Sequence, residues 1–230
     1  MTFDYSIHRS ARRRSVCIQV RQGQVEVRAP LGVADAELRA FVAKKARWIQ
    51  THVTAQQAQL KEVPRYGFTQ GSRLPYLGGE LEVCWARGGG AGSVARQGQE
   101  LLVLLGSRSR LNPEQQARQL VLGWYQREAL RLLSARTQAL AQRLGLNCTR
   151  VSVRATRSKW GHCTREGAIQ YNWQIILAPD SVVDYLVAHE VCHLRHLNHS
   201  AAYWALVASV CPDYLALRAW LKAEGSKLVL

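Results

Sequence analysis

The run His189-Glu190-Val191-Cys192-His193, with His199 six residues later, constrains the fold of this chain more than any other feature. An α-helix turns about 100° per residue, so His189 and His193 would lie about 40° apart and one turn removed. Their imidazoles converge on one ion if the segment is helical. Glu190 lies about 100° round from His189, unsuited as a further ligand but able to reach water held at the ion. The run therefore predicts a helix with two metal ligands and a general base.

A catalytic zinc site uses three protein ligands and an open position, and His199 is the candidate for the third ligand. On an unbroken helix His199 would point about 80° away from His189 and lie about 15 Å along the axis, so the helix must end between them. Asn198 tolerates a left-handed backbone and Ser200 can cap a new helix, so we expect the bend at Asn198. Three histidines with one carboxylate suit zinc, and the sequence predicts Zn²⁺ as the cofactor.

Two other side chains in this segment are expected to stay outside the ligand set. His196 lies three residues after His193, about 60° off the ligand face, and is expected behind the ligands or at the surface. Cys192 points to another side of the helix and is expected to be a small core residue. Asp180 and Asp184 support a helix that begins upstream, because acidic residues favour the positive end of the helix dipole.

Length and composition indicate a globular protein. The chain has 230 residues, 47% of them hydrophobic, which is enough for an ordinary packed core. No apolar stretch approaches the ~18 residues that cross a membrane, and the N-terminus lacks the layout of a signal peptide. Six cysteines are scattered without a Cys-x-x-Cys pair, which favours free thiols over a zinc finger or a disulfide framework. These features predict a cytoplasmic protein with no membrane partner.

The charge is strongly positive. There are 31 Lys and Arg residues against 16 Asp and Glu, a formal net charge of +15. Nucleotides or nucleic acid are therefore possible partners. The only dense basic cluster is Arg12-Arg13-Arg14, and dispersed charge is more typical of a solvated surface than of a binding groove. Charge alone identifies no partner, and no pattern indicates the oligomeric state.

The first half of the chain reads as β-rich. Alternating apolar and polar residues at 15–20 and 25–30, on either side of a turn at Gln22-Gly23, predict a hairpin. A helix is expected from Ala36 to about Leu60, with Trp48 packed on the hairpin. Further short strands are expected between residues 71 and 106, where glycine pairs mark the turns.

The second half reads as mainly helical. Asn112 as a cap and Pro113 at the first position predict a long helix that ends at Gly145. Strands are expected at residues 150–155 and 168–177. The histidine-bearing helix follows, and then a pair of C-terminal helices.

A second motif lies just upstream of the histidines, and with it the chain closely resembles a known family. The similarity is to the small zincin-like metallopeptidases typified by the bacterial YgjP proteins, relatives of the SprT and Wss1-like proteases. It extends over nearly the whole chain, although family members usually carry serine where His162 stands. It rests on Arg157-Ser158-Lys159-Trp160-Gly161-His162-Cys163, Asn172-Trp173, Ala178-Pro179, the histidine run through Asn198-His199-Ser200, and Trp204, with residues 25–30 and 41–49 matching the family's N-terminal part.

The resemblance and the patterns together predict an α+β fold. Residues 1–110 would form a β-rich N-terminal region with one helix. Residues 111–230 would form a mainly helical, minimal zincin-like metallohydrolase core with a small antiparallel sheet. The resemblance implies that His189, His193 and His199 bind zinc.

The predicted function is that of a zinc-dependent hydrolase, first of all a metallopeptidase acting on a peptide or protein. Zinc would activate water and polarise a peptide carbonyl, and Glu190 would be the catalytic base. An extended substrate would lie along an edge strand. The candidate substrate-binding residues are Asn172, Trp160, Arg157 and Tyr203.

Two alternatives stay open. The positive charge would suit a metal-dependent nucleoside triphosphate pyrophosphatase or phosphohydrolase, an activity assigned to some members of the family. Against it, the chain has no Gly-x-x-x-x-Gly-Lys loop, and histidines suit zinc better than magnesium, which prefers oxygen ligands. The second alternative is a non-enzymatic module, DNA-associated or protein-binding, with a structural metal. Only the basic composition supports it, and Glu190 beside an open zinc position argues against it.

Overall fold

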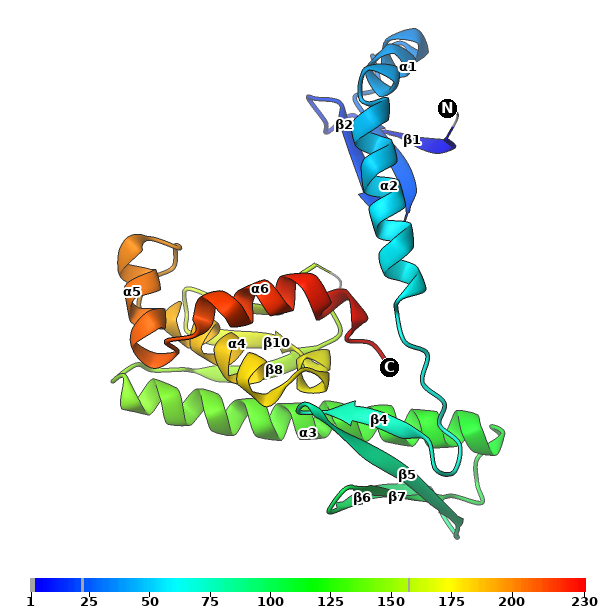
Figure 1. Cartoon of the computed structure of the whole chain (residues 1–230), viewed down its shortest axis with the longest axis vertical. Coiled ribbons are helices and arrows are strands. Elements are labelled where there is room, and N and C mark those ends of the chain that lie inside the picture. Colours follow the sequence, from blue (N-terminus) through cyan, green and yellow to red (C-terminus); the bar gives the residue numbers. More distant parts are fainter. Residues whose placement is uncertain (1–2, 22, 157) are drawn as a thin grey trace. The chain divides into compact units, whose positions relative to one another are not determined.

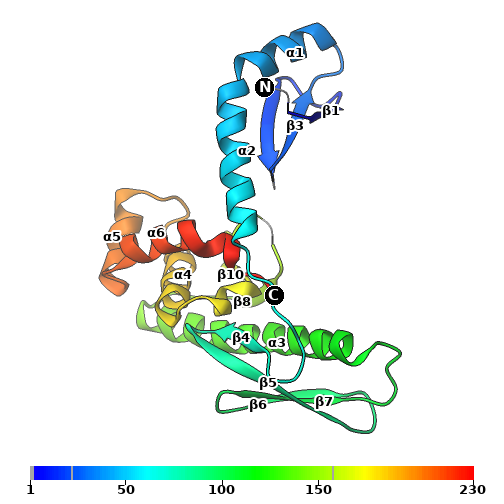
Figure 2. The same ribbon diagram turned by 45° about the vertical axis from the view of Figure 1, so that its right-hand side comes forward.

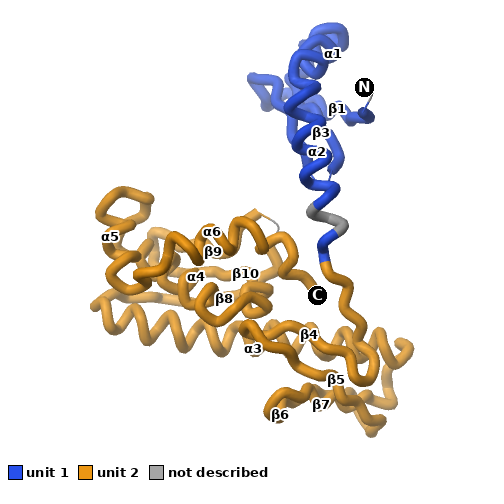
Figure 3. Tube along the Cα trace, viewed as in Figure 1, with its two compact units in different colours: residues 1–63 blue, residues 64–230 orange. Residues whose placement is uncertain are grey.

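The chain divides into two compact units. A computed structural model describes residues 3–21, 23–156 and 158–230. Unit 1 spans residues 1–63 and unit 2 spans residues 64–230 (Figure 3). No described helix is both long and apolar enough to cross a lipid bilayer.

Unit 1 contains a three-stranded mixed sheet (Figure 1). Its strands are β1 (Tyr5–Arg9), β2 (Cys17–Arg21) and β3 (Gln24–Ala29). Strand β3 lies in the middle, antiparallel to β2 and parallel to β1. The β2–β3 pair is the predicted hairpin, and Gly23 in its turn has a φ of 74°, a region that glycine enters at little cost. Gln22 lies outside the described residues.

Two helices follow where one was expected. They are α1 (Asp35–Lys44) and α2 (Ala46–Lys61), which meet at an angle (Figure 2). Lys45 ends α1 with φ −99° and ψ 4°, values outside the helical region. Trp48 was predicted to pack on the hairpin, but it is 44% exposed. The buried apolar residues of the two helices share one core with β3: Leu38, Val42, Ile49, Val53, Val25, Val27 and Ala29.

Unit 2 places a long helix between two sheets, as both ribbon views show (Figures 1 and 2). The helix is α3 (Pro113–Arg143). The first sheet has the strand order β4-β5-β7-β6 and the second has β8-β10-β9. Their strands are β4 (Arg73–Tyr76), β5 (Gly79–Arg87), β6 (Ser93–Gln97), β7 (Glu100–Leu105), β8 (Arg150–Arg154), β9 (Gly161–Cys163) and β10 (Ala168–Asn172).

The second sheet differs from the small antiparallel sheet that the sequence suggested. Strand β10 pairs in parallel with β8 and antiparallel with β9, so the sheet is mixed. The short strand β9 was not expected. Residues 173–177 form a 3-10 helix instead of prolonging β10, because the Asn172 side chain accepts a hydrogen bond from the Gln174 amide and starts the turn.

Helix α3 begins as its sequence predicts. The Asn112 side chain accepts a hydrogen bond from the Gln115 amide at 2.9 Å, and Pro113 occupies the first turn. Buried residues of α3 share one core with the first sheet and with the elements that follow α3. The first sheet is therefore part of unit 2, and the division between compact units falls at Val63, earlier than the boundary at residue 110 expected from the sequence.

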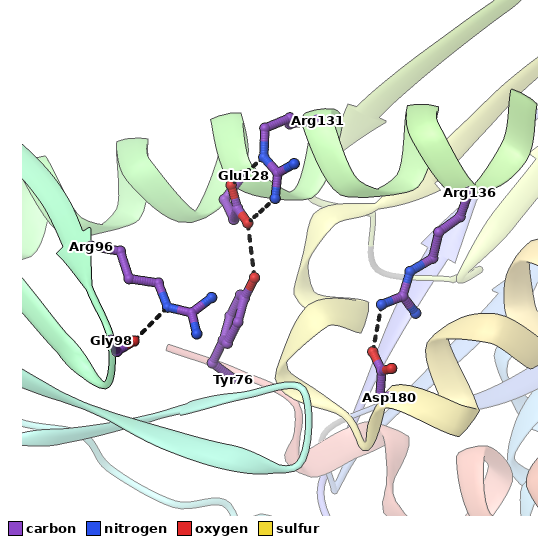
Figure 4. Close-up of polar contacts among 7 residues, drawn as sticks. All are labelled: Tyr76, Arg96, Gly98, Glu128, Arg131, Arg136 and Asp180. Carbon is purple, nitrogen blue, oxygen red and sulfur yellow. Dashed lines mark hydrogen bonds and ion pairs between the residues drawn. The ribbon is translucent and has the colours of Figure 1, made fainter. Parts of the chain in front are cut away.

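Three helices complete unit 2. Arg136 on α3 forms an ion pair with Asp180 at 2.6 Å (Figure 4). It forms a second ion pair with Asp184 at 2.7 Å, and both partners lie in the first turns of the histidine-bearing helix. Nearer the N-terminus of α3, Glu128 accepts a hydrogen bond from the Tyr76 hydroxyl at 2.8 Å (Figure 4). Helix α3 thus holds both β4 and the histidine-bearing helix. The three helices are α4 (Asp180–Cys192), α5 (Ala201–Val210) and α6 (Tyr214–Glu224).

Candidate metal centre

The three predicted ligands come together at the end of α4. His189, His193 and His199 each offer one nitrogen, and these nitrogens all lie within 4.8 Å of one another. The Nε2 atoms of His189 and His199 are 3.4 Å apart. Nitrogens of a tetrahedral zinc site with ordinary Zn–N bonds are separated by about 3.3–3.4 Å. The separation of the His189 and His199 nitrogens is therefore the one expected for two ligands of a single ion.

The chain bends between the second and third histidines, as predicted. Helix α4 ends at Cys192, with His193 as the residue that follows its last turn. Ser200 caps α5 by accepting a hydrogen bond from the backbone amide of Tyr203. Asn198 does not take the left-handed backbone expected of it. The helix ends before Asn198 is reached, so the turn after His193 makes the bend.

Tyr203 contacts the first ligand. Its hydroxyl lies 2.7 Å from Nδ1 of His189 and 3.0 Å from the His189 carbonyl oxygen. A hydroxyl has one proton, which it donates to the carbonyl, so it accepts the Nδ1 proton of the ring. This tautomer leaves the Nε2 lone pair of His189 free for a metal. The hydroxyl of Tyr203 thus lies behind a ligand, and the predicted contact of Tyr203 with substrate stays a prediction.

The second ligand is oriented by the backbone. Nδ1 of His193 lies 2.9 Å from the carbonyl oxygen of His196, which accepts its proton and again leaves Nε2 free. His196 thus supports a ligand through its backbone, while its ring is absent from the ligand cluster. Cys192 is buried with Tyr203 and Val207 in a small core, as its position on α4 predicted.

Aromatic stacking orients the third ligand, which is exposed. The His199 ring stacks on Trp204, with centroids 5.5 Å apart and planes 22° apart. Trp204 also stacks on Tyr214 at 5.2 Å, and the Arg218 guanidinium lies 4.7 Å from the Trp204 ring. The sequence motif included Trp204 but did not predict its contacts with Tyr214 and Arg218, because these two residues approach Trp204 only through the packing of α6.

The surroundings of His189 and His193 favour their neutral forms. Burial, together with the neighbouring His193 and His199, lowers the pKa of His189 to about 3. Burial also lowers the pKa of His193. Neutral imidazoles have the free lone pair that metal binding requires.

Glu190 is a buried carboxyl group, only 3% exposed. Burial raises its pKa to about 8, against the opposing effect of Lys159. Among the described residues, none forms a hydrogen bond with this carboxylate. The carboxyl group is therefore free to exchange a proton with water, and a pKa of about 8 lies close to neutral pH, the range that suits a general base.

Gly161 on β9 makes room for Glu190. A Cβ added at Gly161 would overlap the Glu190 carboxylate and lie 2.5 Å from its Cγ. Strand β9 can approach α4 this closely only because it carries a hydrogen atom at this point. The sequence motif contained Gly161 but did not assign it this role, since the contact joins residues far apart along the chain.

The other candidate substrate-binding residues have different surroundings. Asn172 is buried, and both ends of its side-chain amide form hydrogen bonds within the chain. The oxygen accepts from the Gln174 backbone amide, and the nitrogen donates to the Thr156 carbonyl. Trp160 packs against Gly225, where an added Cβ would lie 3.1 Å from the indole Nε1. These contacts favour structural roles for Asn172 and Trp160. Arg157 lies outside the described residues.

Comparison with known proteins assigns the chain to a family. A solved structure, the metallopeptidase zymogen abylysin of Pyrococcus abyssi, is similar with a TM-score of 0.36 and 19% identity, covering 39% of this chain and 93% of that chain. A comparison with curated proteins gives no significant match. A family model described as the YgjP-like metallopeptidase domain matches residues 14–224, which include all three histidines and the motif around Gly161. The chain therefore belongs to the YgjP-like family of metallopeptidase domains.

Proposed function

We propose that this YgjP-like protein is a zinc-dependent peptidase with His189, His193 and His199 as metal ligands and Glu190 as general base. The observation that carries the proposal is the convergence of three imidazoles, with the buried carboxyl group of Glu190 following the first of them in the chain. Three nitrogen donors leave a fourth position open, the arrangement typical of catalytic zinc. His189 and Glu190 lie in the last turn of α4 and His193 follows that turn, which supports assigning the three ligands and the base to one site.

The donor set fits zinc. Two ligands present Nε2 because their Nδ1 atoms donate hydrogen bonds, that of His189 to the Tyr203 hydroxyl and that of His193 to the His196 carbonyl oxygen. Nitrogen donors without added carboxylates suit zinc better than magnesium or calcium. When bound, zinc would lower the pKa of a water molecule toward neutrality and polarise a peptide carbonyl.

Glu190 would take the proton from the attacking water and pass it to the leaving amine. Its burial favours this exchange, because a carboxylate in a dry site is a stronger base than one in water. Strand β9 forms one edge of its sheet and carries Gly161 against Glu190. A peptide could add to this free edge in an extended conformation. Substrate binding by Arg157 stays a prediction.

Two variants test the proposal. His193→Ala should lose about one equivalent of zinc, and retention of the full metal content would reject His193 as a ligand. Glu190→Gln should keep the zinc and lose at least about 10²-fold in hydrolysis of casein-derived peptides. Unchanged turnover by that variant would remove Glu190 as the base.

The same variants separate the peptidase from a nucleotide hydrolase. Wild type and Glu190→Gln should be assayed in parallel on peptides and on nucleoside triphosphates. Hydrolysis of nucleotides alone, lost in Glu190→Gln, would replace the proposed substrate class and keep the site. A cytoplasmic location is part of the proposal, and it accords with the six cysteines, all of which are unpaired.

A further inference from the structure

An exposed aromatic platform lies on α2, away from the candidate metal residues in sequence. Trp48 is 44% exposed, and its ring lies against that of His52, one turn further on, with centroids 4.1 Å apart and planes 32° apart. Nδ1 of His52 lies 2.8 Å from the Trp48 carbonyl oxygen, a hydrogen bond that fixes the imidazole beside the indole. Two rings thus form one surface in contact with solvent.

Unpaired cations lie next to this platform in the sequence. Lys44, Lys45 and Arg47 are exposed, and within the described part of the chain none of them forms an ion pair. Lys44 is the last residue of α1, four positions before Trp48, and Arg47 precedes Trp48 directly on α2. From Leu38 to Leu60 the sequence contains no acidic residue that could neutralise them. We call Lys44, Lys45, Arg47, Trp48 and His52 the Trp48 platform.

Trp48 is not part of the hydrophobic core of unit 1. Ile49 and Val53 turn the apolar side of α2 to the sheet, where they are 0% and 8% exposed. Unit 1 would therefore lose little packing if Trp48 were smaller. An exposed tryptophan among cations more often serves recognition than folding.

We propose that the Trp48 platform binds single-stranded nucleic acid. Every base has a flat face that can stack on an exposed indole, and neighbouring cations can hold the phosphates on either side. A membrane surface fits less well, because a helix that lies in a bilayer needs a continuous apolar face and that of α2 is buried in unit 1. This binding does not depend on the proposed peptidase activity.

The test uses the full chain and a fluorescently labelled oligothymidylate of about 16 nucleotides, a length that covers a typical single-strand site. Fluorescence anisotropy measured across a salt series gives the affinity and its salt dependence. Trp48→Ala should weaken binding by about 5- to 150-fold, and Trp48→Phe should restore part of the loss. Lys44→Ala/Arg47→Ala should reduce the slope of log K against log salt by about 1.4.

A matched control removes the same charge elsewhere. Arg108 and Arg110 are exposed in the loop before α3, and Arg108→Ala/Arg110→Ala should bind the oligonucleotide more tightly than Lys44→Ala/Arg47→Ala. All variants should melt within a few degrees of wild type and keep their peptidase activity. Equal losses in the two double variants, wild-type affinity in Trp48→Ala, or a preference for anionic lipid vesicles over the oligonucleotide would each overturn the proposal.

Discussion

At Gly161, strand β9 lies so close to Glu190 on α4 that no space is left for a methyl group. In Gly161→Ala the new Cβ would displace the Glu190 carboxylate or push β9 away from α4. A displacement of about 1 Å at a catalytic group can cost about 10²-fold in rate. We expect kcat for peptide hydrolysis to fall by about that factor, with zinc content unchanged. Gly89→Ala is the control, since a Cβ there meets nothing within 4 Å, and equal kcat in both variants would contradict the packing argument.

The hydroxyl of Tyr203 can be removed without changing the shape of the residue. Tyr203→Phe keeps the buried ring and loses the contacts with Nδ1 and the carbonyl of His189. Loss of such a supporting hydrogen bond typically lowers metal affinity by about 10–100-fold. Competition with a coloured chelator measures the change. Tyr214→Phe should bind zinc as wild type does; a shared defect would assign the effect to the aromatic stack instead.

The buried carboxyl group of Glu190 should make the zinc-free protein less stable as the pH rises. Its pKa is about 8 in the folded chain against an ordinary 4.5, so the folded state holds a proton that the unfolded state has released between these values. The contribution of Glu190 to the free energy of unfolding is therefore fully present below about pH 4.5 and is lost as the pH rises toward 8. The Glu190→Gln variant has no ionisable group at this position, so it does not lose this stability as the pH rises.

Urea unfolding with a chelator present measures this difference. Near pH 8, Glu190→Gln should exceed wild type in free energy of unfolding by about 3–5 kcal/mol, and the difference should shrink toward pH 5. The two proteins have the same histidines, so the comparison isolates the carboxyl group of Glu190. The same difference at pH 5 and pH 8 would show that the carboxyl group is not desolvated.

At the scale of elements, Arg136 joins α3 to α4. Its partners Asp180 and Asp184 are 53% and 61% exposed, so solvent screens the two ion pairs. Arg136→Ala should therefore lower the free energy of unfolding by about 1 kcal/mol or less. Zinc affinity should stay unchanged, because the ligands lie at the other end of α4. Equilibrium unfolding and metal titration check both points, and weakened zinc binding would mean that Arg136 sets the position of the whole helix.

Local signals in the sequence predicted the elements that depend on near neighbours. The cap at Asn112, the proline at the start of α3 and the hairpin around Gly23 all involve residues a few positions apart. The convergence of the three histidines was also predictable, because helical spacing and the need for a bend left few arrangements. The position of the bend was wrong at Asn198, since α4 ends earlier.

Contacts between distant segments were beyond the reach of the sequence. Strand β9 has three residues, too few for a pattern, and its pairing with β10 gives it its place. The fit of Gly161 to Glu190, the hydroxyl of Tyr203 behind His189, and the approach of Arg218 to Trp204 each join separate elements. Such contacts follow from packing, and packing follows from the fold as a whole.

At the scale of the whole molecule, the two units should separate at Val63. A fragment of residues 64–230 keeps its complete core, so it should fold, bind zinc and cleave peptides, while losing the affinity for oligonucleotide. A fragment of residues 111–230 lacks the first sheet. It would expose the α3 residues that pack on that sheet, among them Tyr125, whose hydroxyl donates to the Pro75 carbonyl at 2.9 Å. We expect this shorter fragment to aggregate. Circular dichroism and zinc content of both fragments decide where the folding boundary lies.

The small core around Cys192, Tyr203 and Val207 is separate from the main core of unit 2. It joins α5 to the end of α4, and the proposed third ligand, His199, stands between these two helices. Coordination by His199 would therefore act as a reversible cross-link, closing a short loop and reducing the conformational freedom of α5 as a disulfide does in a secreted domain. Zinc would then have two effects: it would supply the chemistry of the site, and its availability would determine how rigid the last third of unit 2 is.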